Sequence, residues 1–357
     1  MTYNEVVKIG ESFLLPMVWE LYELEGYTFT HIERDYIAPN VVYYCDKNDS
    51  ESRILRIAFR SDRNMDDYLG ETEFIRYLHE NGGSVANVIC SRMGNMVEEI
   101  THDKHTFFVC LFEQAKGKLL VENHYQYREG VPIAEYYYDC GKVLGKLHQL
   151  SKVYTPIHRR CSFLDRFTAE YIDTLIPNSL SHCKEKMFSL LQTLKETDQS
   201  REVFGMIHCD FNDGNYNIDF ETGQITVFDF DNSCFGWYMF DLASLWQHGI
   251  GWAQNEPDAN KRKQAMNSYF ETVIAGYRSE TAIDDEVLEN LPLFLQVSLM
   301  EEIIAAFEDM WNSGGVVECD EELSYLIKCL EDDISYKGFY HEIFSCDKPF
   351  EYELRDI

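Results

Sequence analysis

Short apolar segments bounded by polar turns dominate the first third of the chain. They lie at residues 28–46, 53–60 and 101–114, and their β-branched and aromatic residues are typical of strands. Between the second and third segments, apolar residues of the stretch 66–83 recur three and four positions apart, which indicates one helix. A glycine pair ends this stretch and supplies a C-terminal stop. The pattern therefore predicts an antiparallel sheet with a single helix inserted.

Helical spacing of apolar residues takes over after residue 118. It marks the stretches 133–154, 167–176 and 179–199, and it returns from Asp241 onward. Two short strands, 215–220 and 224–230, interrupt the helices, and the polar connection between them contains a glycine, as is typical of a hairpin. We therefore predict a small sheet-rich lobe over 1–113 and a larger helical lobe over 114–357, with a ligand-binding cleft at their interface.

Composition and charge exclude several classes of partner. The chain carries 62 acidic and 31 basic side chains, and its formal net charge of −31 argues against binding to nucleic acid or to anionic membranes. A negative surface favours a cationic substrate, although a demand for solubility explains the same charge. The apolar run Phe107–Phe112 is far shorter than the roughly 20 residues that cross a bilayer, so no membrane span is predicted.

Cysteine usage and the first residues indicate a cytoplasmic protein. The 11 cysteines include no C-x-x-C pair and no Cys/His group at zinc spacing. Reduced thiols in this arrangement fit the cytoplasm better than a secreted disulfide scaffold. The first residues are acidic and polar where a secretory signal would be basic and then apolar, so no export signal is expected. These patterns do not predict the oligomeric state.

The segment His208–Asn215, together with the acidic residue that follows the hairpin, carries the candidate chemistry. Asn215 stands five residues after Asp210, and Asp229 stands 19 residues after it. This arrangement allows all three side chains to fold around one point. Phosphoryl transfer needs such a point, because the attacking hydroxyl must be held in line and must lose its proton. Asp210 is the predicted base, while Asn215 and Asp229 offer the hard oxygen ligands that Mg²⁺ prefers.

These residues resemble the aminoglycoside phosphotransferase and choline kinase superfamily. Its catalytic loop reads His-x-Asp-x-x-x-x-Asn before a metal-binding Asp on a strand, and Asp210, Asn215 and Asp229 match that order. Protein kinases instead have Arg at the position of Cys209 and Asp-Phe-Gly where this chain has Asp-Phe-Asp. The resemblance implies an α+β, bilobal protein-kinase-like fold, with 1–113 as the nucleotide-binding lobe and 114–357 as the catalytic and substrate-binding lobe. It also implies ATP and Mg²⁺ as cofactors and a small-molecule hydroxyl as the phosphoryl acceptor.

The N-terminal lobe contains further elements of this family. Arg56 stands where the family has a basic residue, usually Lys, that contacts the phosphates. Glu71 on the following helix is its predicted partner, and Glu73 is the second choice. A planar guanidinium can still bridge phosphate and carboxylate, but the change from Lys to Arg is not chemically neutral. Asn40 looks like the end of the nucleotide loop, although residues 33–39 contain no glycine to cradle phosphates.

Three other acidic residues near the loop are given different roles. By resemblance, Asp241 braces the catalytic loop from behind. The resemblance also implies that Asp241 begins a helix, a role that suits Asp as a favoured N-cap residue. Asp213 and Asp231 are interpreted as solvated or turn-forming acids, and they are left outside the candidate site.

Several acceptors and rival functions stay open at this level. An amine-bearing sugar of the aminoglycoside type ranks first because of the net charge, followed by choline, ethanolamine and homoserine. A Ser/Thr protein kinase is disfavoured because 12 residues separate Asp229 from Asp241, which leaves little room for a peptide-docking activation segment. A nucleotide-binding pseudokinase that acts as an interaction module and a metal-dependent hydrolase are further alternatives, both disfavoured by the pattern around Asp210 and Arg56.

Overall fold

The computed structural model describes residues 1–33, 40–47, 52–60, 62–312 and 319–334. The chain divides into two compact units, each built from separate segments. Unit 1 comprises Met1–Tyr125, Tyr154–Arg160 and Asp213–Ser233, and unit 2 comprises Gln126–Val153, Cys161–Asn212 and the residues from Cys234 onward. The division at residue 113 into a nucleotide-binding and a catalytic lobe stays a prediction.

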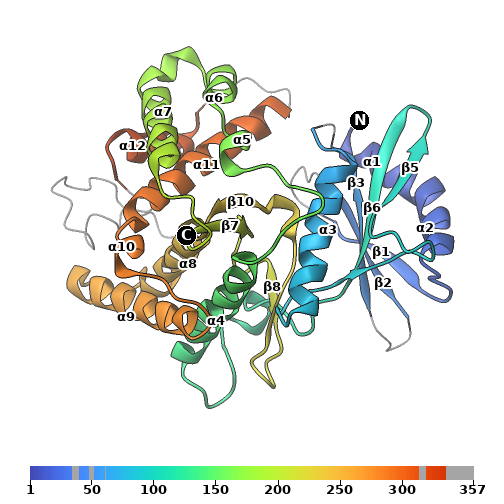
Figure 1. Ribbon diagram of the computed structural model, residues 1–357, viewed down its shortest axis with the longest axis horizontal. Coiled ribbons are helices and arrows are strands. Elements are labelled where there is room, and N and C mark those ends of the chain that lie inside the picture. Colours follow the sequence, from blue (N-terminus) through green and yellow to red (C-terminus); the bar gives the residue numbers. More distant parts are fainter. Residues whose placement is uncertain (34–39, 48–51, 61, 313–318, 335–357) are drawn as a thin grey trace. The chain divides into compact units, whose positions relative to one another are not determined.

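An antiparallel sheet forms the centre of unit 1 (Figure 1). Its strands are β1 (Thr28–His31), β2 (Asn40–Asp46), β3 (Arg53–Ala58), β4 (Val88–Ile89), β5 (Glu98–His102) and β6 (His105–Glu113). They lie in the order β1-β2-β3-β6-β4, and β5 also pairs with β6. The register places Arg56 opposite Val42 on one neighbouring strand and opposite Cys110 on the other. Arg56 thus lies on an inner strand of the sheet.

Helices cover both faces of this sheet. They are α1 (Tyr3–Ile9), the π-helical turn η1 (Gly10–Leu14), α2 (Leu15–Leu21) and α3 (Met65–Glu80), with a 3-10 turn, η2 (Val121–Asn123), further along unit 1. The segment from α1 to α2 packs against Leu55 and Ile57 of β3. Because side chains alternate along a strand, Arg56 and Ala58 face the other side, where α3 packs through Tyr68. The predicted helix is confirmed as α3, whereas the N-terminal helices had not been predicted.

The predicted hairpin is confirmed as β8 (Tyr216–Ile218) and β9 (Ile225–Val227), and it belongs to unit 1. The backbone of Val227 donates to Ser84 and accepts from Ala86, both at 2.9 Å. Ile218 donates to the carbonyl of Lys118 at 2.8 Å and accepts from its N–H at 3.1 Å. These bonds attach the hairpin to the same unit as the sheet.

Unit 2 is mainly helical. Its helices are α4 (Ile133–Ser151), α5 (Phe163–Arg166), α6 (Ala169–Leu175), α7 (Ser181–Glu196), α8 (Tyr238–Ala253), α9 (Ala259–Arg278), α10 (Asp285–Leu288), α11 (Leu291–Asn312) and α12 (Glu321–Glu331), with the turn η3 (Asn178–Leu180) and the paired strands β7 (Phe204–Ile207) and β10 (Cys234–Trp237). Glycines let α4 and α9 approach closely, because a Cβ on Gly141 would lie 1.9 Å from the carbonyl oxygen of Val273.

One stretch of the described residues, Asp285–Asn312, is long and apolar enough to cross a membrane by length and composition alone. The share of its most apolar window that is buried inside the protein is 56%, and α11 buries residues such as Phe294 and Met300. A core helix passes the same test, so this stretch does not overturn the expectation of no membrane span. The described cysteines are all free thiols, in line with the expected reduced state.

Candidate active site

The loop that follows β7 is held by the carboxylate of Asp241. Its Oδ2 accepts a hydrogen bond from the backbone N–H of His208, and its Oδ1 accepts one from Cys209, both at 2.9 Å. Cys209 has a φ of 66°, in the left-handed region that non-glycine residues rarely adopt. A fully buried carboxylate that satisfies two successive N–H groups stabilises this strained backbone. The loop that carries Asp210 is therefore fixed by α8.

Asp241 braces the loop as predicted, but it does not cap the helix. α8 begins at Tyr238, with Trp237 at the N-cap position, so Asp241 lies inside the first turn. Both of its carboxylate oxygens are used by the loop. The expected N-cap role is wrong because Asp is also favoured within a first turn, where it faces the positive end of the helix dipole.

His148 of α4 supports Asp241 from the other side. Its Nε2 lies 3.1 Å from Oδ2 of Asp241, and its Nδ1 lies 3.0 Å from the hydroxyl of Tyr277. Burial lowers the pKa of His148, and the hydrogen bond to Asp241 offsets this shift only in part. The ring is therefore neutral near pH 7, with Nε2–H donating to the carboxylate and Nδ1 accepting from the tyrosine.

Asp210 is half-buried and is oriented within its own loop. The amide of Asn212 donates to Oδ1 of Asp210 at 2.6 Å and to its backbone carbonyl at 3.1 Å. Glu301 of α11 has a pKa raised to about 8, mainly by burial, which the charge of Arg166 opposes and the charge of Asp210 reinforces. Because Glu301 is then protonated near pH 7, it adds no second negative charge near Asp210.

Asn215 and Asp229 lie at the same end of the β8–β9 hairpin. The register pairs Tyr216 with Val227, and the backbone N–H of Phe228 donates to the carbonyl of Asn215 at 2.9 Å. Asp229 follows directly, with an exposed side chain and a φ of 62°. Asx residues tolerate this left-handed conformation best among non-glycine residues. Asn215 and Asp229 thus lie at one end of the hairpin, and Asp229 is the N-cap residue of the 3-10 turn η4 (Phe230–Asn232).

The donor atoms of this pair suit a divalent cation whose coordination is completed by a substrate. Among the described residues, no group of three or more His, Cys, Asp or Glu side chains could hold a metal ion by itself. Mg²⁺ is bound in proteins through one or two carboxylates together with phosphates and water, rather than by a protein cage. Asn215 and Asp229 supply a donor set of that kind.

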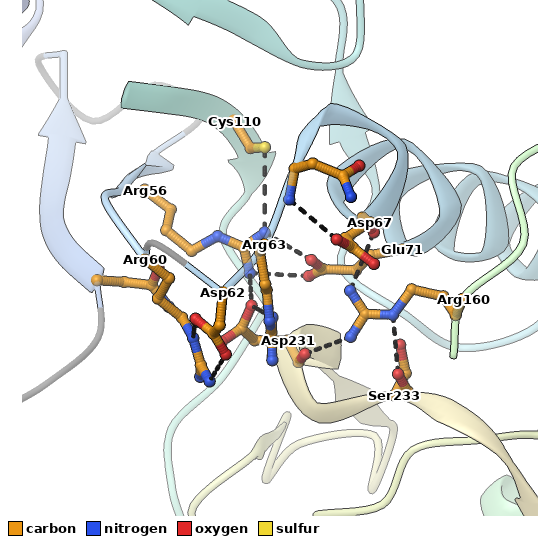
Figure 2. Close-up of polar contacts among 12 residues, drawn as sticks. Arg56, Arg60, Asp62, Arg63, Asp67, Glu71, Cys110, Arg160, Asp231 and Ser233 are labelled. Carbon is orange, nitrogen blue, oxygen red and sulfur yellow. Dashed lines mark hydrogen bonds and ion pairs between the residues drawn. The ribbon is translucent and has the colours of Figure 1, made fainter. Parts of the chain in front are cut away.

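Arg56 and Glu71 form a buried, bidentate ion pair (Figure 2). Nη1 and Nη2 of Arg56 each lie 2.8 Å from one oxygen of Glu71. Burial lowers the pKa of Arg56, but the charges of Glu71 and Asp231 raise it by more, so this guanidinium stays charged. Glu73, the second choice of partner, instead bonds to His158. The role of Arg56 and Glu71 in binding phosphates stays a prediction.

Asp231 lies in the turn η4, as expected of a turn-forming acid, but it is not solvated, so that part of the interpretation is wrong. Its side chain is buried, and Oδ1 makes a short contact with Arg63 and lies 3.8 Å from Arg56. The amide of Asn40 donates to Oδ2 at 3.2 Å. Burial alone would raise the pKa of Asp231, but the surrounding arginines, led by Arg63, hold it below its usual range. The basic turn after β3 was the available sequence signal, yet only the fold brings it to Asp231.

Arg160 ties the turn that carries Asp231 to the start of α3 (Figure 2). Its Nη2 donates to the carbonyl of Asp231 at 2.5 Å, and its Nε donates to that of Ser233 at 2.8 Å. Its Nη1 donates to the carbonyl of Asp67 at 2.9 Å. Sequence reasoning missed Arg160, because no local pattern marks an arginine that satisfies three distant carbonyl groups.

The structure brings together most, but not all, of the predicted site residues. Unit 1 contains Arg56, Glu71, Asn40, Asn215 and Asp229, whereas Asp210 belongs to unit 2. The convergence of Asp210 with the other residues therefore stays a prediction. The predicted nucleotide loop lies mostly outside the described residues, which omit 34–39.

The chain is similar to known proteins that transfer phosphoryl groups. The model of the phosphotransferase enzyme family matches residues 30–278. The amicoumacin kinase of Bacillus subtilis (strain 168) is 28% identical over 291 residues, which cover 80% of this chain and 82% of that protein. A solved amicoumacin kinase, in complex with AMP-PNP, Ca²⁺ and Ami, is 25% identical with a TM-score of 0.78, covering 94% of this chain and 97% of that one.

A more distant likeness extends the comparison of folds. The solved microcompartment-associated aminopropanol kinase is 19% identical, with a TM-score of 0.64 over 89% of this chain and 93% of that one. With the sheet of unit 1 and the helices of unit 2, these similarities confirm the predicted α+β, protein-kinase-like fold.

Proposed function

Because this chain belongs to the phosphotransferase enzyme family and is a small-molecule kinase, we propose that it transfers the γ-phosphoryl group of ATP to the hydroxyl of an amine-bearing small molecule. In this step the acceptor oxygen bonds to the γ-phosphorus, and the bond from that phosphorus to the bridging oxygen breaks. ADP leaves, and the proton of the hydroxyl passes to the carboxylate of Asp210.

The brace between Asp241 and the loop is the single observation that carries this proposal. It holds a strained backbone at Cys209, directly before Asp210, with two hydrogen bonds of 2.9 Å. A general base must meet the acceptor hydroxyl at hydrogen-bond distance, so its backbone has to be fixed in advance. The contact from Asn212 orients the Asp210 carboxylate for the same task.

Asn215 and Asp229 are the residues that would hold the divalent cation, which we propose is Mg²⁺. When bound, the ion neutralises charge on the phosphates. The hairpin keeps both side chains at one end, and the exposure of Asp229 suits a group that must receive a ligand from solvent. Arg56, positioned by Glu71, would contact the phosphates, and Asn40 would support this contact through Asp231.

The acceptor is proposed from similarity and charge together. Amicoumacin is the first compound to test, because a curated relative and a solved relative are both amicoumacin kinases. The net charge of −31 supports an acceptor that carries an amine. Aminoglycosides, choline, ethanolamine and homoserine form the rest of the acceptor panel. We place the enzyme in the cytoplasm, as its free thiols suggest.

The test measures ADP release from ATP and Mg²⁺ with each acceptor. The wild type should release ADP only with its acceptor, and Asp210→Asn should lose about 100-fold or more of kcat while still binding ATP. Asp213→Asn removes the same charge three residues away and should behave like the wild type. ATP binding with no turnover on any acceptor would point to the interaction module instead. Turnover on protein substrates would point to a protein kinase.

A further inference from the structure

Four arginines gather around the turn that follows Asp229 (Figure 2). This arginine cluster consists of Arg56, Arg60, Arg63 and Arg160. Three carboxylates neutralise it, those of Asp62, Glu71 and Asp231. Arg160 instead bonds to three backbone carbonyl groups, so the cluster holds one more guanidinium group than ion-paired carboxylates. In a chain with a net charge of −31, such a local excess favours an anionic ligand.

Arg56 is poorly placed to bind phosphates alone. Both of its terminal nitrogens bond to Glu71, so the fork that would grip a phosphate is already occupied by a carboxylate. Its Nε is buried and has no hydrogen-bond partner among the described residues. In addition, residues 33–39 contain no glycine, so the close backbone cradle that protein kinases place over the phosphates is not encoded.

Arg63 is held differently. Within the described part of the chain, it bonds through Nη1 alone, to the carboxylate of Asp231. Burial lowers its pKa, and the positive charges of Arg60 and Arg160 lower it further, against the opposing effect of Asp231. The guanidinium remains charged because an arginine titrates far above neutral pH. Arg63 thus shares a single carboxylate partner, Asp231, with Arg56, which lies 3.8 Å from the same oxygen.

The fold keeps Arg63 beside the candidate metal residue. Asp231, its partner, lies two residues after Asp229 on the same turn. Arg160 bonds to the backbone of this turn and to Asp67 in the first turn of α3. Arg63 directly precedes the N-cap residue of that helix. The turn and the start of α3 are therefore joined, and Arg63 lies at the junction.

We propose that Arg63 is a second phosphate-binding residue, which contacts the triphosphate of ATP together with Arg56, and that Asp231 is its positioning residue. This inference rests on the proposed function. Arg63 supplies from a side chain part of the positive charge that a glycine-rich loop supplies from its backbone. Asp231 holds the guanidinium ready through one nitrogen and leaves the other nitrogens to the phosphates.

Calorimetric binding of ATP and of adenosine, each with Mg²⁺, tests this inference in the full-length protein. Arg63→Gln should weaken ATP binding roughly 10- to 100-fold, as expected for the loss of a charge-assisted hydrogen bond, and should leave adenosine binding unchanged. Arg63→Lys keeps the charge, so its ATP affinity should lie between those of the wild type and Arg63→Gln. Arg60→Gln is the charge-matched control, since Arg60 has its own partner in Asp62, and it should change ATP binding much less.

A double-mutant cycle tests the role of Asp231. If Asp231 positions Arg63, the loss of ATP affinity caused by Arg63→Gln should be smaller in an Asp231→Asn background. If the two residues had independent structural roles, the two losses would add. ATP affinity of Arg63→Gln within twofold of the wild type, or an equal loss for ATP and adenosine, overturns the inference and leaves the proposed function standing. A folded wild type that binds no ATP overturns both.

Discussion

The backbone N–H of Cys209 donates to Oδ1 of Asp241 over 2.9 Å, at a residue whose φ is 66°. The carboxylate that restrains this conformation is fully buried, and its other oxygen serves His208 and His148. Replacing Asp241 therefore tests how far catalysis depends on a fixed loop.

Asp241→Asn should reduce both activity and stability. An amide offers one oxygen, so one of the two loop N–H groups loses its acceptor, at a cost of roughly 1–3 kcal/mol for a buried unsatisfied donor. We expect a large fall in kcat and a much smaller change in the KM for ATP. Steady-state kinetics measures both, and urea unfolding measures the loss of stability. Ser244→Ala removes one hydrogen bond to Phe211 of the same loop and should cost less. Equal effects of the two variants would contradict a special role for Asp241.

Arg56→Lys should retain more activity than Arg56→Gln. The ammonium group keeps the charge beside Glu71 and the phosphates but cannot reproduce the bidentate geometry, so the KM for ATP should rise moderately. Glu71→Gln should destabilise the protein by roughly 3–5 kcal/mol, because it leaves a buried cation short of its main partner. Kinetics and urea unfolding of the three variants check this order. Indistinguishable Lys and Gln variants would show that the charge at position 56 is not used.

Gly70→Ala should destabilise the protein, although Ala normally favours a helix. A Cβ on Gly70 would lie 2.7 Å from the carbonyl oxygen of His158 and 3.1 Å from Cγ of Arg160, so the segment that carries Arg160 would have to move. Gly251→Ala is the control. No atom lies within 4 Å of that added Cβ on α8, and the change should stabilise the protein by about 0.5–1 kcal/mol. Thermal unfolding compares them, and a stabilised Gly70→Ala variant would contradict the close packing.

Glu301 should make stability depend on pH. Its pKa is raised to about 8 in the folded protein, against about 4.3 for an unperturbed glutamate. The folded state therefore holds this proton more tightly, and the resulting stabilisation is complete below the unfolded pKa and is lost as pH rises through 8. The free energy of unfolding of the wild type, minus that of Glu301→Gln, should decrease as the pH is raised from 5 to 9. Glu308→Gln on the same helix is the control, and a difference that stays flat in both variants would contradict the raised pKa.

Local patterns predicted much of the framework. Short apolar segments between polar turns marked the strands, and apolar residues recurring three and four positions apart marked α3. The family resemblance paired Arg56 with Glu71, and the structure shows this contact. The hairpin between Asn215 and Asp229 followed from a polar, glycine-containing connection. These features depend on residues close in sequence, where backbone geometry is regular.

Other features required contacts over long sequence separations. Asp231 looked like a solvated acid, because the side chains that bury it, Arg63 and Asn40, lie about 170 and 190 residues earlier in the chain. Arg160 belongs to a short segment between two helices of unit 2, yet it packs within unit 1. The N-cap expectation for Asp241 failed because α8 begins at Tyr238, so Asp241 lies within the first turn, where both carboxylate oxygens bind loop N–H groups.

The sequence by itself determined the class of the protein and predicted the residues of its candidate site, since the order of Asp210, Asn215 and Asp229 can be seen without coordinates. Only the tertiary structure decided which charges are buried together. The free energy of a charged side chain depends on the dielectric environment and on its partners, and both are set by segments that meet only in the folded chain. Asp229 and Asp231 are chemically identical side chains two residues apart, and folding exposes the first and buries the second among arginines.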